Sequence, residues 1–191
     1  MTVHSWQMLE AVAAVGNLAY TVLMMNEKRV GWLFGITASS IGVVLFMHQQ
    51  VYAQVGLSAF YVVMGVYGWW SWGRGDSGGL PISRRPPSFH LAIIGLGTVF
   101  TLCVAAALKL LPEARFTSLD GFATAFSLLA TWMLARKVLE NWAYWIVADA
   151  VAIVLYVLLG MWWYAGLYAI YVVLSASALV RWHRSWKAAQ G

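Results

Sequence analysis

One acidic side chain, Asp149, lies in an otherwise apolar part of this sequence, at the end of the stretch ENWAYWIVAD (140–149). Trp145 lies four residues before it, and Trp142 lies three residues before Trp145. At these spacings the three side chains share one face of an α-helix. A carboxylate beside indole rings suits a flat aromatic cation, which stacks on the rings and balances the charge. These residues therefore predict a binding site for a ligand of that kind.

The composition indicates that this site lies in a membrane protein. The chain has 191 residues, of which 62% are hydrophobic and 10% are charged, whereas a soluble domain carries about 25% charged residues. The net charge of +5 therefore reports membrane orientation rather than nucleic-acid binding. Cys103 is the single cysteine, which excludes a disulfide framework and a thiolate metal site. No P-loop is present, and we expect no cofactor.

Seven segments are long and apolar enough to cross a bilayer of about 30 Å. They are 6–25, 31–49, 52–72, 89–111, 118–135, 142–160 and 162–182. The first lacks the basic residues that precede a cleaved signal peptide, so we expect it to be retained. Tryptophans near the segment ends are expected in the interfacial belt. Among them are Trp162, Trp163 and Trp182.

The basic residues are unequally divided between the two sides of this predicted membrane. One side carries only Lys109 and Arg115. The other side carries Lys28, Arg29, Arg74, Arg84, Arg85, Arg136, Lys137, Arg181, Arg184 and Lys187. Since cytoplasmic loops are rich in Lys and Arg, the N-terminus is predicted outside and the C-terminus in the cytoplasm.

A shift of 110 residues aligns the chain with itself without a gap. The matching pairs include Trp32 with Trp142, Tyr61 with Tyr171, and Trp72 with Trp182. Apolar residues match by chance in such sequences, but aromatic pairs in one register indicate an internal repeat. We therefore expect repeat one in residues 1–72, a loop and a linking span in 73–111, and repeat two in 112–191.

Each repeat holds three segments, so the segment between them returns the chain to the starting side. The predicted fold is an all-α membrane protein with seven transmembrane helices in a 3+1+3 arrangement of two parallel repeats. Carriers built from such repeats bind their substrate near the midplane, at the repeat interface. Architecture alone thus favours a carrier.

Polar and aromatic side chains recur at helical spacing in these segments and are expected to face the interior. The candidate ligand contacts, besides the three residues above, are Asn17, Ser39, Ser58, Tyr61, Ser127, Tyr168 and Tyr171. Asp149 is the strongest candidate, because a carboxylate in a membrane costs about 2.5–3.5 kcal/mol on insertion scales. Apart from Arg181 at the very end of the last segment, no Lys or Arg lies within the six repeat segments. This leaves protonation, a hydrogen bond to Ser or Tyr, or an incoming cation for Asp149.

The motifs YGWW (67–70), ENWAYW (140–145) and IYVVLSASALVRW (170–182) resemble those of PnuC-type vitamin transporters. The resemblance extends from the first segment to the last. It implies a full-length SWEET-like fold and facilitated diffusion of nicotinamide riboside, which cytoplasmic phosphorylation then traps. It also implies that Trp145 and Asp149 contact the substrate. Ser58, however, stands where many members have Gln, so thiamine or a related vitamin is the alternative substrate.

Other functions have less support in the sequence. His4, His48, His90 and His183 are dispersed near segment ends and form no HExxH or Ser/His pair, so an enzyme is not expected. A channel lacks a ring of charges or a filter-like loop. Proton coupling through Asp149 stays open, as does a homo-oligomer. The expected partners are the bilayer of a bacterial inner membrane and a small flat aromatic cation.

Overall fold

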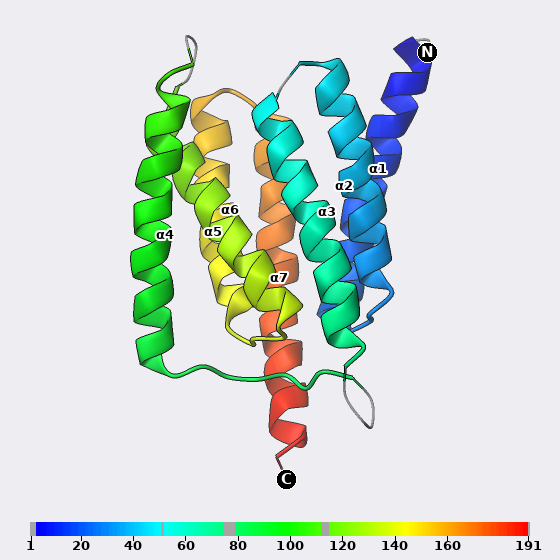
Figure 1. The fold of residues 1–191 in the computed structure, drawn as a ribbon, viewed down its shortest axis with the longest axis vertical. Helices are drawn as coiled ribbons and strands as arrows, with labels where there is room; N and C mark the ends of the chain where they lie inside the picture. Colours follow the sequence, from blue (N-terminus) through cyan, green and yellow to red (C-terminus); the bar gives the residue numbers. More distant parts are fainter. Residues whose placement is uncertain (1–2, 51, 75–78, 112–114, 191) are drawn as a thin grey trace. The chain divides into compact units, whose positions relative to one another are not determined.

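Figure 1 shows the computed structural model, which describes residues 3–50, 52–74, 79–111 and 115–190. These residues form seven α-helices. They are α1 (Val3–Met25), α2 (Gly31–His48), α3 (Tyr52–Trp72), α4 (Pro87–Leu108), α5 (Thr117–Ala135), α6 (Asn141–Leu158) and α7 (Trp162–Ala188). Helices suit such apolar segments, because a backbone surrounded by hydrocarbon must satisfy its hydrogen bonds internally.

Each predicted segment falls on one of these helices. Within the described residues, six of the helices are long and apolar enough to cross a membrane. The helix outside this group is α3, whose C-terminal half mixes Gly, Ser and Tyr with its apolar residues. The chain is therefore an all-helical membrane protein with six apolar helices, and the seventh span stays a prediction.

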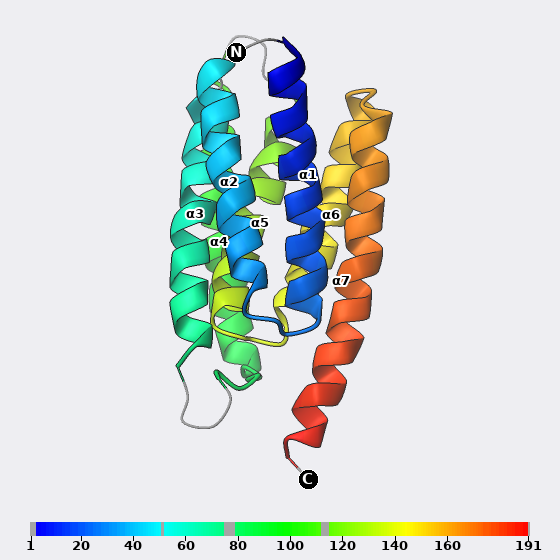
Figure 2. The same cartoon turned by 90° about the vertical axis from the view of Figure 1, so that its right-hand side faces the viewer.

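The helices group into two compact units, Met1–Pro81 (unit 1) and Ile82–Gly191 (unit 2). In unit 1, α2 packs against both α1 and α3. In unit 2, α5 packs against α4 and α6. The helix α6 also packs against α7, the pair at the right of Figure 2. Unit 1 therefore holds three helices, and unit 2 holds four.

The offset of 110 residues recurs in the helix bounds. The helix α2 begins at Gly31 and ends at His48, and α6 begins at Asn141 and ends at Leu158. The ends of α1 and α5 and the starts of α3 and α7 differ by the same amount. The α7 helix continues to Ala188, beyond the predicted end at residue 182. Three helices of unit 2 thus repeat the three of unit 1 in sequence.

The turns repeat as closely as the helices. Between α1 and α2, the Lys28 amide donates to the Leu23 carbonyl at 2.9 Å, and between α5 and α6, Val138 donates to Met133 at 3.0 Å. The second helix of each repeat is followed by a left-handed residue, Gln50 at φ 60° and Gly160 at φ 73°. Both repeats therefore form the same turns from different side chains.

A pair of perpendicular tryptophans lies inside each unit. The ring centroids of Trp32 and Trp72 are 5.6 Å apart, and those of Trp142 and Trp182 are 5.5 Å apart. All four side chains are buried. The prediction that Trp182 lies in the interfacial belt is wrong, because its ring packs edge-to-face on Trp142 and is 0% exposed. Trp163, by contrast, is 93% exposed.

The helix α4 lies along α5 with close backbone contact. A Cβ at Gly121 of α5 would lie 2.8 Å from the Thr101 carbonyl oxygen of α4. A Cβ at Gly97 of α4 would lie 2.7 Å from the Phe126 ring of α5. Small residues at these two places let the helices approach, as is common between membrane helices.

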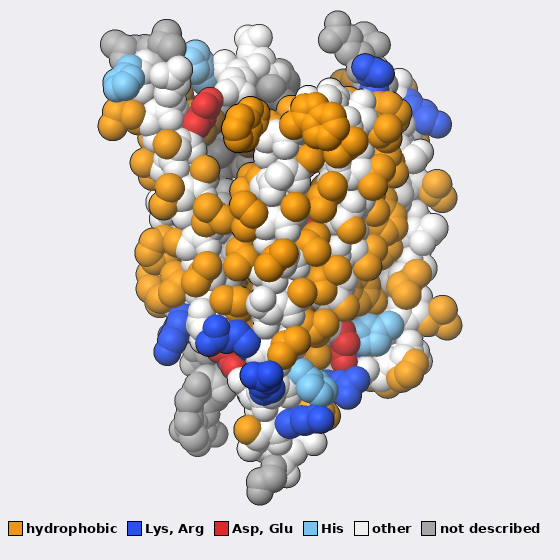
Figure 3. Space-filling view, turned by 180° about the vertical axis from the view of Figure 1, so that it is seen from behind, with side chains coloured by type: hydrophobic (Ala, Val, Ile, Leu, Met, Phe, Trp, Pro, Cys, Tyr) orange, Lys and Arg blue, Asp and Glu red, His pale blue; other side chains and the backbone are white. Residues whose placement is uncertain are grey.

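Hydrophobic side chains cover the long faces of the helices, and charged side chains gather at the helix ends (Figure 3). The helix α4 exposes several apolar side chains that no neighbouring helix covers, among them Leu91, Leu96, Val99 and Leu102. A soluble protein rarely exposes so much apolar surface. This distribution fits helices that stand in a bilayer.

Candidate functional site

The helix α6 carries Trp142, Trp145 and Asp149 on one face. Trp142 is 2% exposed and Asp149 is 3% exposed, whereas Trp145 is half-buried. The Trp142 ring is held by Trp182, and its Nε1 atom is buried without a hydrogen-bond partner among the described residues. Trp142 is thus mainly a packed residue, and Trp145 is the more accessible of the two rings.

Asp149 is buried without a compensating cation. The ion pairs formed by the described residues of unit 2 do not include its carboxylate. The Tyr171 hydroxyl on α7 lies close enough for an electrostatic interaction with Asp149. The ring of Tyr171 in turn meets Tyr168 edge-on at 5.9 Å. The structure therefore brings three predicted residues, Asp149, Tyr168 and Tyr171, into one neighbourhood.

The tyrosine cluster continues along α6 and α7 with residues that sequence reasoning did not select. Tyr156 hydrogen-bonds Tyr168, and their ring centroids are 5.2 Å apart. Tyr156 also stacks on Tyr164 at 5.3 Å and interacts electrostatically with Asp120 of α5. A series of phenol rings thus extends from the Asp149 neighbourhood toward the loop between α6 and α7. In the predicted repeat, Tyr156 is aligned with Phe46, which is apolar. The comparison of polar positions between the repeats therefore did not select Tyr156.

Ser127, the predicted polar residue of α5, is half-buried. Its backbone carbonyl accepts a hydrogen bond from the Thr131 hydroxyl at 2.8 Å. Ser127 therefore lies on the expected helix, and its place in the ligand site stays a prediction.

The predicted residues of unit 1 are more scattered. Ser58 of α3 is 7% exposed and packs on α2, where a Cβ at Gly42 would lie 3.1 Å from its Oγ atom. Asn17 of α1 is exposed, and its carbonyl accepts the Thr21 hydroxyl at 3.0 Å. Ser39 is half-buried. Tyr61 is half-buried too and interacts electrostatically with Tyr20.

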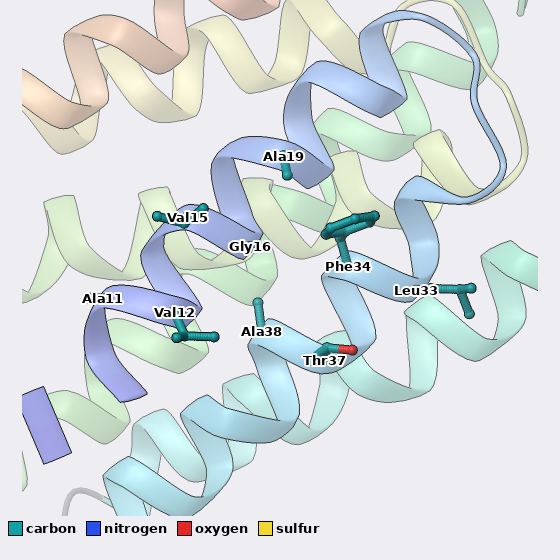
Figure 4. A pocket seen from close by; sticks show the side chains of 9 residues that line it. All are labelled: Ala11, Val12, Val15, Gly16, Ala19, Leu33, Phe34, Thr37 and Ala38. Carbon is teal, nitrogen blue, oxygen red and sulfur yellow. The ribbon is translucent and has the colours of Figure 1, made fainter. Parts of the chain in front are cut away.

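A groove in unit 1 lies elsewhere, between α1 and α2 (Figure 4). It holds about 530 Å³ and is lined by Ala11, Val12, Val15, Gly16, Ala19, Leu33, Phe34, Thr37 and Ala38. Thr37 is the single polar side chain among them. In repeat two, the counterparts of Ala11 and Gly16 are Gly121 and Phe126, which α4 covers. The groove is apolar and holds none of the predicted site residues.

A polar network at the start of α6 was also missed from the sequence. Glu140 accepts a hydrogen bond from Arg84 Nε at 3.1 Å, and His90 Nδ1 lies 3.1 Å from the Tyr144 hydroxyl. Asn141 is 0% exposed and donates to the Val138 carbonyl at 2.7 Å. The described residues contain no group of three or more His, Cys, Asp or Glu side chains that could hold a metal ion.

Almost the whole chain matches one protein-family model. The family model described as nicotinamide mononucleotide transporter matches residues 7–184. The chain belongs to this family. The predicted resemblance to PnuC-type vitamin transporters is thereby confirmed, and the chain is a multi-pass membrane transporter of the PnuC type.

Two kinds of curated relative match this transporter. The nicotinamide riboside transporter PnuC of Escherichia coli K12 is 25% identical over 185 residues, which cover 83% of this chain and 77% of the relative. The riboflavin/roseoflavin transporter RibM of Streptomyces davaonensis is 27% identical over 181 residues, which cover 90% of this chain and 82% of the relative. The family is therefore shared by transporters named for different vitamins.

A solved structure has the same fold. The crystal structure of the vitamin B3 transporter PnuC matches with a TM-score of 0.75 and 22% identity, over 94% of this chain and 82% of the other. The likeness extends over parts of both units of this transporter. At this identity it establishes the fold and not the substrate.

Proposed function

We propose that this transporter carries nicotinamide riboside into a bacterial cell across the inner membrane by facilitated diffusion, and that cytoplasmic phosphorylation traps the product. The observation that carries the proposal is Asp149, a buried carboxylate without an ion-pair partner among the described residues of unit 2. A permanently charged pyridinium ring would supply the missing cation. The E. coli relative, named a nicotinamide riboside transporter, supports this choice.

In the proposed mechanism, the substrate ring stacks on Trp145, and Asp149 balances its charge. Tyr168, Tyr171 and Tyr61 offer further aromatic surface. Hydroxyl groups of the substrate bond to Asn17, Ser39, Ser58 and Ser127. For Ser58 this requires movement of α2 away from α3, because Ser58 now packs on Gly42. The substrate leaves past Trp142.

The proposed architecture is the 3+1+3 arrangement with seven spans, in which α4 links two parallel repeats as in SWEET-like carriers. The equal helix bounds at an offset of 110 support it. The distribution of Lys and Arg supports an outside N-terminus and a cytoplasmic C-terminus. Repeats that rock about the bound ligand would then provide alternating access.

A second substrate is favoured by the RibM relative, whose name gives riboflavin. Thiamine remains the alternative suggested by Ser58. Charge separates the riboside and thiamine from riboflavin, since the first two are cations and riboflavin is neutral. A buried carboxylate is expected to discriminate against a neutral ring, because the ligand then leaves the charge unbalanced.

The test is calorimetric binding of the purified transporter to nicotinamide riboside, thiamine and riboflavin, with Asp149→Asn as a second sample. We expect the wild type to bind the riboside and the variant to lose at least about tenfold in affinity, which is 1.4 kcal/mol. Expression and thermal stability of the variant control for misfolding. Unchanged affinity in Asp149→Asn would remove Asp149 from the site. Binding of riboflavin or thiamine alone would replace the riboside as substrate.

A further inference from the structure

Glu140 connects three parts of unit 2 at the point where α6 begins. Its Oε1 atom accepts a hydrogen bond from Arg84 Nε at 3.1 Å in an ion pair. Its Oε2 atom lies 3.9 Å from His90 Nε2. Arg84 belongs to the segment before α4, and His90 lies in the first turn of α4. One carboxylate thus faces the connecting segment, α4 and α6.

Backbone hydrogen bonds reinforce this contact. The Ser83 amide donates to the Lys137 carbonyl at 2.9 Å, and the Leu139 amide donates to the Ser83 carbonyl at 2.9 Å. Ser83 is therefore paired with Val138 in an isolated parallel bridge. We call Ser83, Arg84, His90, Val138 and Glu140 the clasp.

The closed clasp leaves polar atoms without partners. Glu140 Oε2, His90 Nε2 and Ser83 Oγ are buried and form no hydrogen bond with any described residue. Such atoms destabilise the closed state, because water would bond to them if the clasp opened. The Arg84 side chain is 51% exposed, so its ion pair adds little stability. The side chains of the clasp therefore stabilise its closed state only weakly.

Repeat one holds its corresponding turn in another way. Position 140 corresponds to Val30, which has no carboxylate. There, Arg29 Nε donates to the Trp69 carbonyl at 2.7 Å, so the turn is fixed to α3 of the same repeat. The clasp on the connecting segment is therefore a feature of the repeat that carries Asp149.

We propose that Glu140 is the positioning residue of this clasp, and that the clasp must open for α6 to move when the transporter releases its substrate. The inference rests on the proposed transport function. A helix transmits such a movement as a rigid rod, and Asp149 lies nine residues from Glu140, about 14 Å along α6. The clasp thus controls the helix that carries Trp145 and Asp149.

A reversible disulfide tests the proposal. The paired residues of a parallel bridge have Cα atoms about 4.8 Å apart, which lies within the disulfide range of about 4.4–6.8 Å. Ser83→Cys/Val138→Cys is therefore made in a Cys103→Ser background and reconstituted in liposomes. After oxidation, we expect binding of nicotinamide riboside to be retained and its uptake to fall at least about tenfold, with recovery on reduction. The single Ser83→Cys variant under the same oxidant should transport normally.

The outcomes separate the two proposals. If the oxidised double variant transports as fast as the reduced one, the clasp need not open and the inference is wrong. If the Cys103→Ser parent takes up none of the three vitamins, the transport proposal fails. A second measurement, which needs no substrate, then decides on the clasp.

This second measurement is amide hydrogen exchange at Leu139, whose N–H is bonded to the Ser83 carbonyl. Glu140→Gln and Arg84→Gln should each speed this exchange about two- to fivefold, because loss of an exposed ion pair loosens the clasp modestly. Arg85→Gln is the matched control, since Arg85 is exposed and lies over the Phe89 ring instead. Equal exchange in Glu140→Gln, Arg84→Gln and Arg85→Gln would show that Glu140 does not hold the clasp.

Discussion

Gly68 of α3 leaves room for the buried indole of Trp32. A Cβ at this position would lie 2.4 Å from Trp32 Cε2, which real side chains do not tolerate. We therefore expect Gly68→Ala to lower the free energy of unfolding by about 1–3 kcal/mol, because the indole or α3 has to shift. Thermal denaturation of the purified protein in detergent measures this change.

The matched control is Gly56→Ala on the same helix. Nothing lies within 4 Å of a Cβ at Gly56, so the substitution should stabilise the helix by up to about 1 kcal/mol. A similar loss of stability in both variants would show that α3 does not tolerate alanine in general. The close contact with Trp32 would then not be the cause.

At the residue level, the sequence predicted the charge and aromatic face of α6 but not the partners of its first turn. Asp149 stands out because no cation lies near it in sequence, and the structure adds none within the described part of unit 2. Glu140 could not be assigned in this way, because Arg84 is 56 residues away and only the fold brings it near. Ser58 had the spacing of a ligand contact, yet spacing does not separate a helix-packing face from a cavity.

At the element level, the turn between α6 and α7 depends on glycine. Gly160 has a φ of 73°, which a residue with a Cβ adopts at a cost. Gly160→Ala is expected to destabilise the protein by about 1 kcal/mol. The control is Gly166→Ala within α7. A Cβ at this position meets nothing within 4 Å, so the substitution should be neutral or stabilising. Chemical denaturation of both variants in the same detergent measures the difference in their free energies of unfolding. Equal values would show that the turn is not strained by a Cβ at residue 160.

The helices themselves were largely predictable from hydropathy. All seven predicted segments lie on helices, because long apolar runs have no other way to satisfy their backbone in lipid. The end of α7 was missed, since Arg181, Arg184 and Lys187 lower the hydropathy without ending the helix. Trp182 was misassigned for the same reason, because its place near a predicted span end concealed its packing on Trp142.

At the scale of the whole molecule, the proposed orientation predicts which surface positions face outside. Leu110, after α4, is 84% exposed, and Arg184 is exposed near the end of α7. In a Cys103→Ser background, Leu110→Cys should react with a membrane-impermeant maleimide on intact cells, because its loop carries few basic residues. Arg184→Cys should react only after the cells are permeabilised.

The reverse labelling pattern would contradict the proposed orientation. Labelling of both positions on intact cells would contradict the proposed odd number of spans between Leu110 and Arg184. In either case, the side on which the Lys and Arg distribution places Arg84 of the clasp would have to change. The hydrogen-exchange test of Glu140 would still stand, because it does not depend on the side.

The sequence predicts the repeat because a few aromatic pairs share one register, and the helix bounds at the same offset agree with it. The consequence of the repeat for α4 could not be predicted in this way, since α4 has no counterpart in repeat one. The helix covers Gly121 and Phe126, while the corresponding surface at Ala11 and Gly16 is an open groove.

An engineer who wished to shorten this transporter could therefore not replace α4 by a flexible tether. In the proposed 3+1+3 arrangement, the tether would have to cross the bilayer to restore the chain direction. It would also leave uncovered the Phe126 ring of α5, which lies against Gly97 of α4. The reverse modification, in which a helix is added to unit 1, has a place to pack, because the groove between α1 and α2 contains the counterparts of residues that α4 covers. The two halves of this chain are thus unequal as building blocks, although they share one pattern of helices and turns.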